Sequence, residues 1–123
     1  DGHLHVKDDV TAFSTSVGSD RRLKENIKPL ENNLEKILEL KPSSFRWKIN
    51  QKKDDVGLIA QEVEPILPEV VKEVHSIGNE VVDLTGEIHH KTIDYSKLTT
   101  FLIGAIQEQQ KQIDELKKKL EEL

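Results

Sequence analysis

A serine and a lysine five residues apart are the residues of this chain that could do chemistry. Ser19 follows Gly18 and precedes Lys24 in the stretch VGSDRRLKENI, residues 17–27. A serine hydroxyl becomes a nucleophile when a neighbouring base takes its proton, and a lysine can be that base without a histidine. Such a pair would attack a carbonyl group, as a serine peptidase does.

The charges around the lysine decide whether it can act as a base. The reference pKa of a lysine is about 10.4, and only burial or nearby positive charge favours the neutral amine. Arg21 and Arg22 would favour the neutral form, whereas Asp20 and Glu25 would favour the ammonium form. The sequence leaves this balance open.

Helix geometry limits how Ser19 and Lys24 can meet. Five residues rotate by about 500° on a regular helix, which leaves the two side chains about 140° apart. They meet if Ser19 precedes the helix in extended backbone, or if Lys24 reaches Ser19 of another chain. In the alternative interpretation Ser19 is the N-cap of a helix that begins at Asp20, and Lys24 is a solvated charge.

The composition is poor for a compact monomer. The chain has 123 residues, of which 35% are hydrophobic and 33% are charged. A core of ordinary density needs more apolar side chains, so part of the chain is elongated or buried against copies of itself. The net charge of -5 disfavours polyanions, so we expect neither nucleic acid nor a membrane as partner.

Metal and disulfide chemistry find no support in the sequence. The chain has no cysteine, which excludes disulfides and thiolate ligands. Its histidines and carboxylates show no recognised ligand spacing, so we expect no metal and no cofactor. The histidines are His3, His5, His75, His89 and His90.

The first half of the chain predicts one short helix after a polar start. Residues 1–18 alternate and then become small, which indicates the end of an upstream β-rich region. A turn of helix is expected at residues 20–26. Pro29 is well placed to open a helix that stops before Pro42, with an apolar face of Leu30, Leu34, Ile37 and Leu38.

Residues 42–93 predict small β-structures. Residues 44–49 alternate as a strand, in which Phe45 and Trp47 are expected in a core or an interface, and residues 50–55 form a polar turn. Residues 56–63 are a strand or the start of a short helix, which Pro65 and Pro68 limit in length. Residues 70–74 and 80–84 flank a Gly-Asn turn as a hairpin, and residues 87–93 add another strand.

From Ser96 the chain predicts a coiled coil. Ile106, Ile113 and Leu120 occupy heptad position a, and position d holds Leu102, Gln109, Leu116 and Leu123. So narrow a seam needs another helix, and a copy of the same chain is the simplest partner. The alternative is an amphipathic helix packed on its own domain. Heptad rules leave the number of strands open, and Lys117 and Lys119 at e and g do not fix it.

These elements together predict an α+β fold: a helix, a small β-hairpin module over residues 19–95, and a long C-terminal coiled-coil helix over residues 96–123.

Two motifs resemble a known family. Residues 19–27, SDRRLKENI, are similar to the SDxRLKxNI signature of the intramolecular chaperone auto-processing domain found at the C-terminus of phage endosialidases, tail fibres and neck appendages. Residues 56–63, VGLIAQEV, are similar to its second motif. The resemblance covers roughly residues 12–123, with the motifs in the family's order.

The resemblance implies a homotrimeric chaperone that assembles the upstream fibre region of its own chain and then cuts itself off as a single-turnover peptidase. Cleavage would fall between Gly18 and Ser19, with Ser19 as nucleophile and Lys24 as general base, and would release residues 1–18 with the fibre. Asp20, Arg22 and Asn26 are possible supporting residues. The precursor would assemble in the cytoplasm of the host bacterium.

Two alternatives stay open. The domain could be a trimerisation module whose serine and lysine are inert, since a coiled coil and hairpins suit both functions. It could also be the related self-cleaving domain of a membrane-tethered transcription factor.

Overall fold

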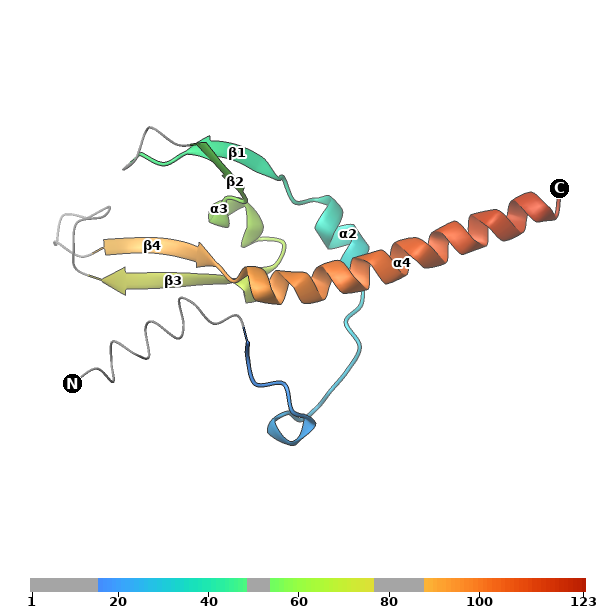
Figure 1. Cartoon of the computed structure of the whole chain (residues 1–123), viewed down its shortest axis with the longest axis horizontal. Coiled ribbons are helices and arrows are strands. Elements are labelled where there is room, and N and C mark those ends of the chain that lie inside the picture. The colour runs from blue at the N-terminus through green and yellow to red at the C-terminus, as the bar shows by residue number, and fades with distance from the viewer. Residues whose placement is uncertain (1–15, 49–53, 77–87) are drawn as a thin grey trace.

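A long helix is the axis of the molecule, and smaller elements gather around its N-terminal half. The computed structural model describes residues 16–48, 54–76 and 88–123. Two antiparallel hairpins and two short helices pack near the start of the long helix, whose C-terminal half projects beyond them (Figure 1). The predicted α+β fold class is therefore confirmed.

The elements follow one another in short steps along the chain. In order they are η1 (Arg21–Leu23), α2 (Asn33–Leu38), β1 (Ser43–Arg46), β2 (Asp54–Gly57), α3 (Ala60–Val63), η2 (Pro68–Val70), β3 (Val71–Ser76), β4 (Ile88–Ile93) and α4 (Tyr95–Glu121). Residues 16–32, which include η1, form an extended strap that leaves the body beside α4 (Figure 1).

The first hairpin pairs β1 with β2 from Ser43 opposite Gly57 to Arg46 opposite Asp54. The Arg46 guanidinium donates to the Asp54 carboxylate at 3.1 Å in the last pair of this ladder, where β1 ends and β2 begins. Asp54 and Asp55, predicted in a polar turn, belong to β2 instead, because they complete the ladder opposite β1. Residues 56–63, predicted as strand or helix, supply both the end of β2 and helix α3.

The aromatic residues of the first hairpin lie near the surface. Trp47 packs edge to face on Phe45, with ring centroids 5.0 Å apart, and its indole donates to Asp55 at 3.1 Å. Trp47 is 54% exposed, so the prediction that it lies in a core is wrong for the single chain.

The second hairpin pairs β3 with β4, from Val71 opposite Ile93 to Ser76 opposite Ile88. The strand predicted near residue 87 is thus present as β4. The predicted strand at residues 80–84 and its Gly-Asn turn lie outside the described residues. Lys91 of β4 forms an ion pair with Glu64 beside α3, and this carboxylate raises the pKa of Lys91.

The core lies where α3, η2 and α4 meet. Its buried members are apolar side chains from these three parts of the chain, and partly buried side chains of α2, of the second hairpin and of the segments after α2, β2 and α3 cover them. The buried members are Val63, Leu67, Val70, Leu98 and Phe101. A core this small is consistent with the low hydrophobic content of the sequence.

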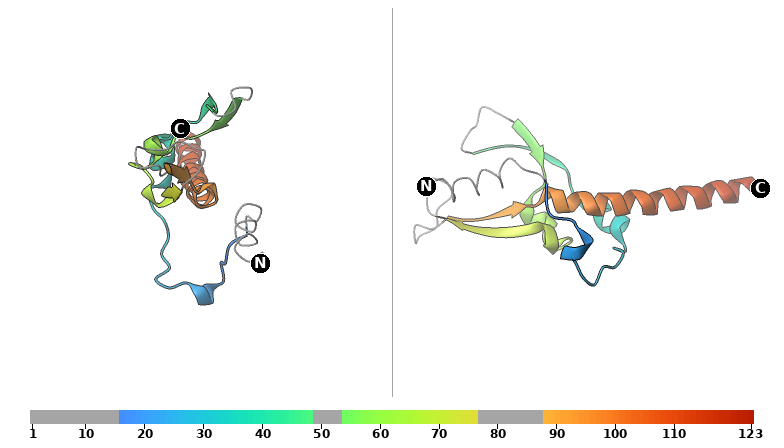
Figure 2. Two further views of the ribbon diagram at one scale, coloured as in Figure 1. Left: turned by 90° about the vertical axis from the view of Figure 1, so that its left-hand side faces the viewer. Right: turned by 60° about the horizontal axis from the view of Figure 1, so that its bottom comes forward.

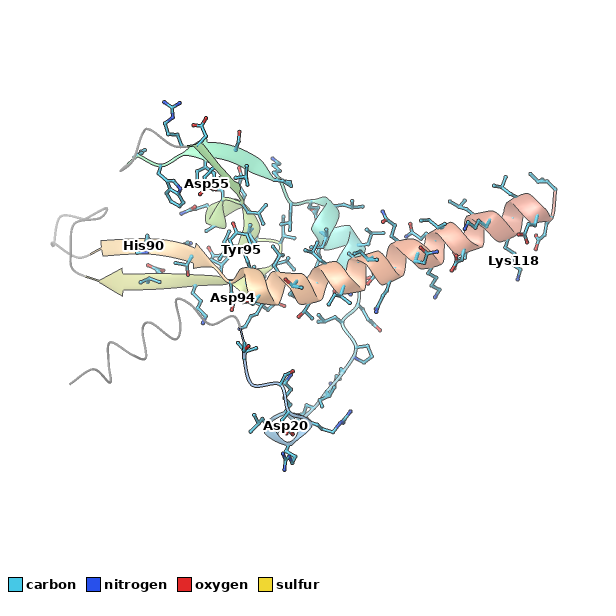
Figure 3. All side chains as sticks on the ribbon, in the orientation of Figure 1. Asp20, Asp55, His90, Asp94, Tyr95 and Lys118 are labelled. Atoms are coloured by element: carbon cyan, nitrogen blue, oxygen red, sulfur yellow. The ribbon has the colours of Figure 1, made fainter. Side chains whose placement is uncertain are left out.

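A tyrosine at the start of α4 holds the second motif in place. The Leu58 amide donates to the Tyr95 hydroxyl at 3.0 Å. A Cβ at Gly57 would lie 2.9 Å from the same oxygen, so a side chain there would break the contact. Tyr95 lies beside these elements in Figure 3.

Glu108 of α4 caps the N-terminus of α2. Its Oε1 accepts from the Leu34 amide at 2.9 Å, and its Oε2 accepts from the Asn33 amide at 3.0 Å and from Asn33 Nδ2 at 2.8 Å. The first amides of a helix have no partner within the helix, and a carboxylate is favourable there. A side chain 75 residues away along the chain from Asn33 thus supplies the cap.

The glycine in α4 makes room for this cap. Asn33 is only 1% exposed, and its side chain lies directly against Gly104. A Cβ at Gly104 would lie 2.4 Å from Asn33 Nδ2 and 2.7 Å from its Cγ. Asn33, Gly104 and Glu108 together form the contact that we call the α2–α4 lock.

The helix predicted to open at Pro29 begins four residues later. Asn32 has a left-handed backbone with φ 60°, which ends any helical run from Pro29 and directs the chain into the lock. The predicted apolar face is also partly wrong, since Leu30 and Leu38 are exposed whereas Ile37 packs on the core. The helix ends before Pro42, as predicted.

No helix among the described residues is both long and apolar enough to cross a membrane.

We expect Gly104→Ala to lower the free energy of unfolding by about 1–3 kcal/mol, because the buried Asn33 side chain cannot move away from the added methyl group. At a helix position without such a contact, replacing glycine by alanine would stabilise the protein by about 1 kcal/mol. A loss of stability therefore points to the contact with Asn33. Chemical denaturation at fixed protein concentration measures it. Gln107→Ala, on the exposed side of α4, is the control; a Gly104→Ala protein as stable as this control would contradict the lock.

Acid should weaken the lock through Glu108. The amides of Leu34 and Asn33 lower the pKa of Glu108, so its contribution is complete above its unfolded pKa of about 4.3 and is lost as the pH falls through the lower folded pKa. Glu108→Gln should therefore reduce stability at pH 7 and flatten its acid dependence. Denaturation at pH 7 and pH 3 tests this, with Glu121→Gln as control, and equal pH dependence in all three proteins would refute it.

Candidate active site

The signature stretch forms a single tight turn on the strap. Asp20 is the N-cap of η1, and its Oδ1 accepts from the Arg22 amide at 2.8 Å. Backbone bonds from Leu23 to Asp20 and from Lys24 to Arg21 close the turn at 2.9 and 3.0 Å. The alternative in which Ser19 is the N-cap is therefore wrong, because Asp20 occupies that position.

This turn brings Ser19 and Lys24 together within one chain. Lys24 Nζ donates to Ser19 Oγ at 2.7 Å. Ser19 precedes η1, and Lys24 follows it in extended backbone with φ -126° and ψ 150°. The 140° offset of a regular α-helix does not apply, because one 3-10 turn separates the two residues and both flanks are extended.

Asp20 and Arg22 stabilise the turn through each other. The guanidinium donates from Nε to Oδ1 at 3.1 Å and from Nη2 to Oδ2 at 2.8 Å. These bonds lower the pKa of Asp20 and raise that of Arg22. Both residues are exposed (Figure 3 labels Asp20), so their role in this structure is to shape the backbone between Ser19 and Lys24.

Leu23 lies against the glycine that precedes the serine. A Cβ at Gly18 would be 3.3 Å from Leu23 Cδ1, which is a tight contact. The leucine side chain therefore covers one side of the Gly18 backbone.

Asn26 turns the strap after the signature turn. Its φ of 57° is in the left-handed region, which asparagine tolerates better than most residues. Asn26 thus contributes to the site through its backbone, since it sets the direction in which the chain continues after Lys24.

The candidate site is open to solvent in the single chain. Ser19 and Lys24 are exposed, and so are the apolar side chains of the strap, with Leu23 at 74%. The strap extends away from the body on one side of α4 (Figures 1 and 2).

The predicted seam of α4 is also uncovered. Leu98, Phe101 and Ala105 are buried against the module, so the first turns of α4 do pack on their own domain. Beyond them the heptad residues face solvent, and Ile106 is 65% exposed. The other exposed seam residues are Leu102, Ile113, Leu116, Leu120 and Leu123.

Among residues 16–48, 54–76 and 88–123, no three histidine or acidic side chains gather as a metal site would require. His3 and His5 lie outside this part of the chain.

Residues 19–72 match the family model described as a chaperone of endosialidase, whose name also classes the family as a peptidase. The match begins at Ser19 and includes η1, the lock residue Asn33 and the second motif. Over these residues the chain matches the chaperone-of-endosialidase family.

Tail-fibre proteins of phages are among the chain's relatives. It is 41% identical over 108 residues to the long tail fiber protein Gp37 of Enterobacteria phage M1, covering 82% of this chain and 39% of that protein. It is 36% identical over 115 residues to Gp37 of Salmonella phage S16, covering 88% of this chain and 14% of that protein. The chain thus spans well under half the length of these relatives.

The sequence did not reveal two parts of the site's support. Leu23 looks like an ordinary apolar residue until its contact with Gly18 is seen, and no local pattern points to Glu108 as a cap for α2. Gly104 did carry a signal, because a lone glycine in a helix indicates a close approach.

Proposed function

We propose that this chain is the C-terminal intramolecular chaperone of a phage tail-fibre protein, and that it cuts its own bond between Gly18 and Ser19. One observation carries the proposal: Lys24 Nζ lies 2.7 Å from Ser19 Oγ inside the stretch that matches the family model. That distance is within the reach needed for proton transfer between a nucleophile and its base. The tail-fibre relatives favour a fibre over a transcription factor as the upstream part.

The chemistry would be an acyl shift followed by hydrolysis. Neutral Lys24 takes the proton of Ser19 Oγ, which attacks the carbonyl carbon of Gly18. The C–N bond breaks, the lysine returns the proton to the amine of Ser19, and the acyl group is now held as an ester on Oγ. Water then cleaves the ester, giving a carboxylate at Gly18 and a free hydroxyl at Ser19. Each copy acts once.

A homotrimer is the assembly that we propose for the working state. The exposed seam of α4 supports it, since apolar heptad residues on a projecting helix are stable only when other helices cover them. The family resemblance supplies the number three, which the heptad pattern leaves open.

Trimerisation gives the chaperone its function. A fibre built from strands of three chains depends on non-local contacts, which form slowly and expose strand edges. A trimeric domain at the end of the chains holds them in register at high effective concentration. Cleavage after assembly removes the registering device, so the finished fibre is kinetically trapped.

The proposal divides the chain into three parts. Residues 1–18 belong to the released fibre, residues 19–95 form the chaperone module, and residues 96–123 form the coiled coil. Assembly would take place on the precursor in the cytoplasm of the host bacterium, and the fibre would enter the virion.

Self-cleavage is tested by intact mass spectrometry of the purified protein. The unaltered chain should give a product that begins at Ser19, whereas Ser19→Ala and Lys24→Ala should remain uncut because each removes one half of the dyad. Lys28→Ala removes another exposed lysine of the strap and should cut normally. A folded, unaltered protein that stays at full mass would leave only the non-cleaving trimerisation module.

Trimerisation is tested by sedimentation equilibrium in the Ser19→Ala background, where every chain stays whole. We expect a trimer, and we expect Ile113→Asp to dissociate it because the change puts a charge into the apolar seam. Gln107→Asp adds the same charge at polar heptad position b and should keep the trimer. Equal molecular masses for the two variants would argue against the seam as the interface.

A further inference from the structure

An open apolar groove of about 490 Å³ lies between α2, β2 and α4. Ile37 and Leu40 line it from the α2 side, Val56 and Leu58 from β2 and the segment after it, and Leu98 and Leu102 from α4. Leu102 is also a seam residue, so the groove opens beside the surface that faces other copies in the proposed trimer. Val56, which lines the groove, is 76% exposed. So exposed an apolar side chain in an apolar groove indicates a surface that another group covers.

The strap carries apolar side chains that are largely exposed. Leu23, Ile27 and Leu30 are all about half exposed or more. Charged residues stand between them, on a segment that lies away from the two hairpins (Figure 1). Burial of such side chains is the main favourable term in protein association.

The groove and the strap lie on different sides of the long helix. The β1–β2 hairpin, which contributes to the groove, is on one side of α4, and the strap is on the other, in both views (Figures 1 and 2). If the strap of one copy binds the groove of the next, the contact joins two different surfaces and is heterologous. Such contacts form a closed ring when the rotation from copy to copy closes. A trimer around the α4 seam supplies such a rotation.

We propose that the strap of one copy docks in the groove of the next copy, and that this docking completes the cleavage site. The inference rests on the proposed function and deepens it. Leu23 contacts Gly18, so a neighbour that buries Leu23 also removes water from the bond between Gly18 and Ser19 and from the adjoining Ser19–Lys24 pair. The apolar cover favours the neutral amine that the base requires.

Charge favours the same pairing. The strap carries four basic and three acidic side chains, whereas the whole chain has a net charge of -5. A slightly basic segment is therefore attracted to the acidic body of another copy. The occupant of the groove is thus a second copy of this chain, and cleavage is coupled to assembly because a lone chain leaves its own site uncovered.

Crosslinking tests the docking without using cleavage as the readout. The chain has no cysteine, so Ile27→Cys in the strap and Val56→Cys in the groove can be combined in a Ser19→Ala chain. A short bis-maleimide should convert this protein into covalent trimers on a denaturing gel, because each copy joins the next around the ring. Ile27→Cys with Leu38→Cys is the matched control, since Leu38 is as exposed but does not line the groove, and it should lose the trimer band.

Other band patterns would overturn the proposal. A crosslinked monomer would place the strap in its own groove, and a covalent dimer without trimer would indicate a two-fold contact. The absence of crosslinks in a protein that sediments as a trimer would leave the groove to another occupant. Covalent trimers from a protein whose unaltered form never cuts would keep the docking and overturn the peptidase step alone.

Mixed trimers connect the docking to the chemistry. Val56→Asp puts a charge into the groove but leaves Ser19 and Lys24 intact, and alone it should lose cleavage. When co-expressed with a Ser19→Ala chain, which cannot cut but has an intact groove, the Val56→Asp chain should be cut again. Cleavage of Val56→Asp alone at the unaltered rate, or no recovery in the mixture, would refute the coupling.

Discussion

The carboxylate of Glu108 holds the first turn of α2 against α4, and this contact sets where the strap of residues 16–32 joins the body. Three hydrogen bonds join Glu108 to Asn33 and Leu34. The Asn33 side chain fits only because Gly104 has no Cβ. The strap therefore leaves the body at a defined point on the long helix, where Asn33 Nδ2 also donates to the Leu30 carbonyl at 3.0 Å.

This arrangement separates the geometry of the site from its environment. The turn from Asp20 to Lys24 sets the distance between Ser19 Oγ and Lys24 Nζ with local bonds, so a single chain already has the two side chains in contact. Ser19, Lys24 and Leu23 are nevertheless exposed in that chain. In the function that we propose, assembly would supply the low-polarity cover that the single chain lacks.

The long helix serves both halves of the proposed function. Its first turns are buried in the module core through Leu98 and Phe101, and its later turns expose a seam for copies of itself. If copies associate along the seam, each module would move together with its own α4, because the first turns of that helix belong to the module core. The same helix carries the cap for α2, so it also fixes where the strap of each copy begins.

The sequence by itself determined the features that depend on neighbours along the chain. The heptad spacing predicted α4 to within one residue of its start, and the signature stretch predicted a helical turn, because helix period and turn chemistry are local. The tertiary structure decided the rest: α2 begins at Asn33 and not at Pro29, and Trp47 is exposed. The start of α2 depends on a carboxylate 75 residues away, and no local pattern encodes which distant side chain will reach a helix end.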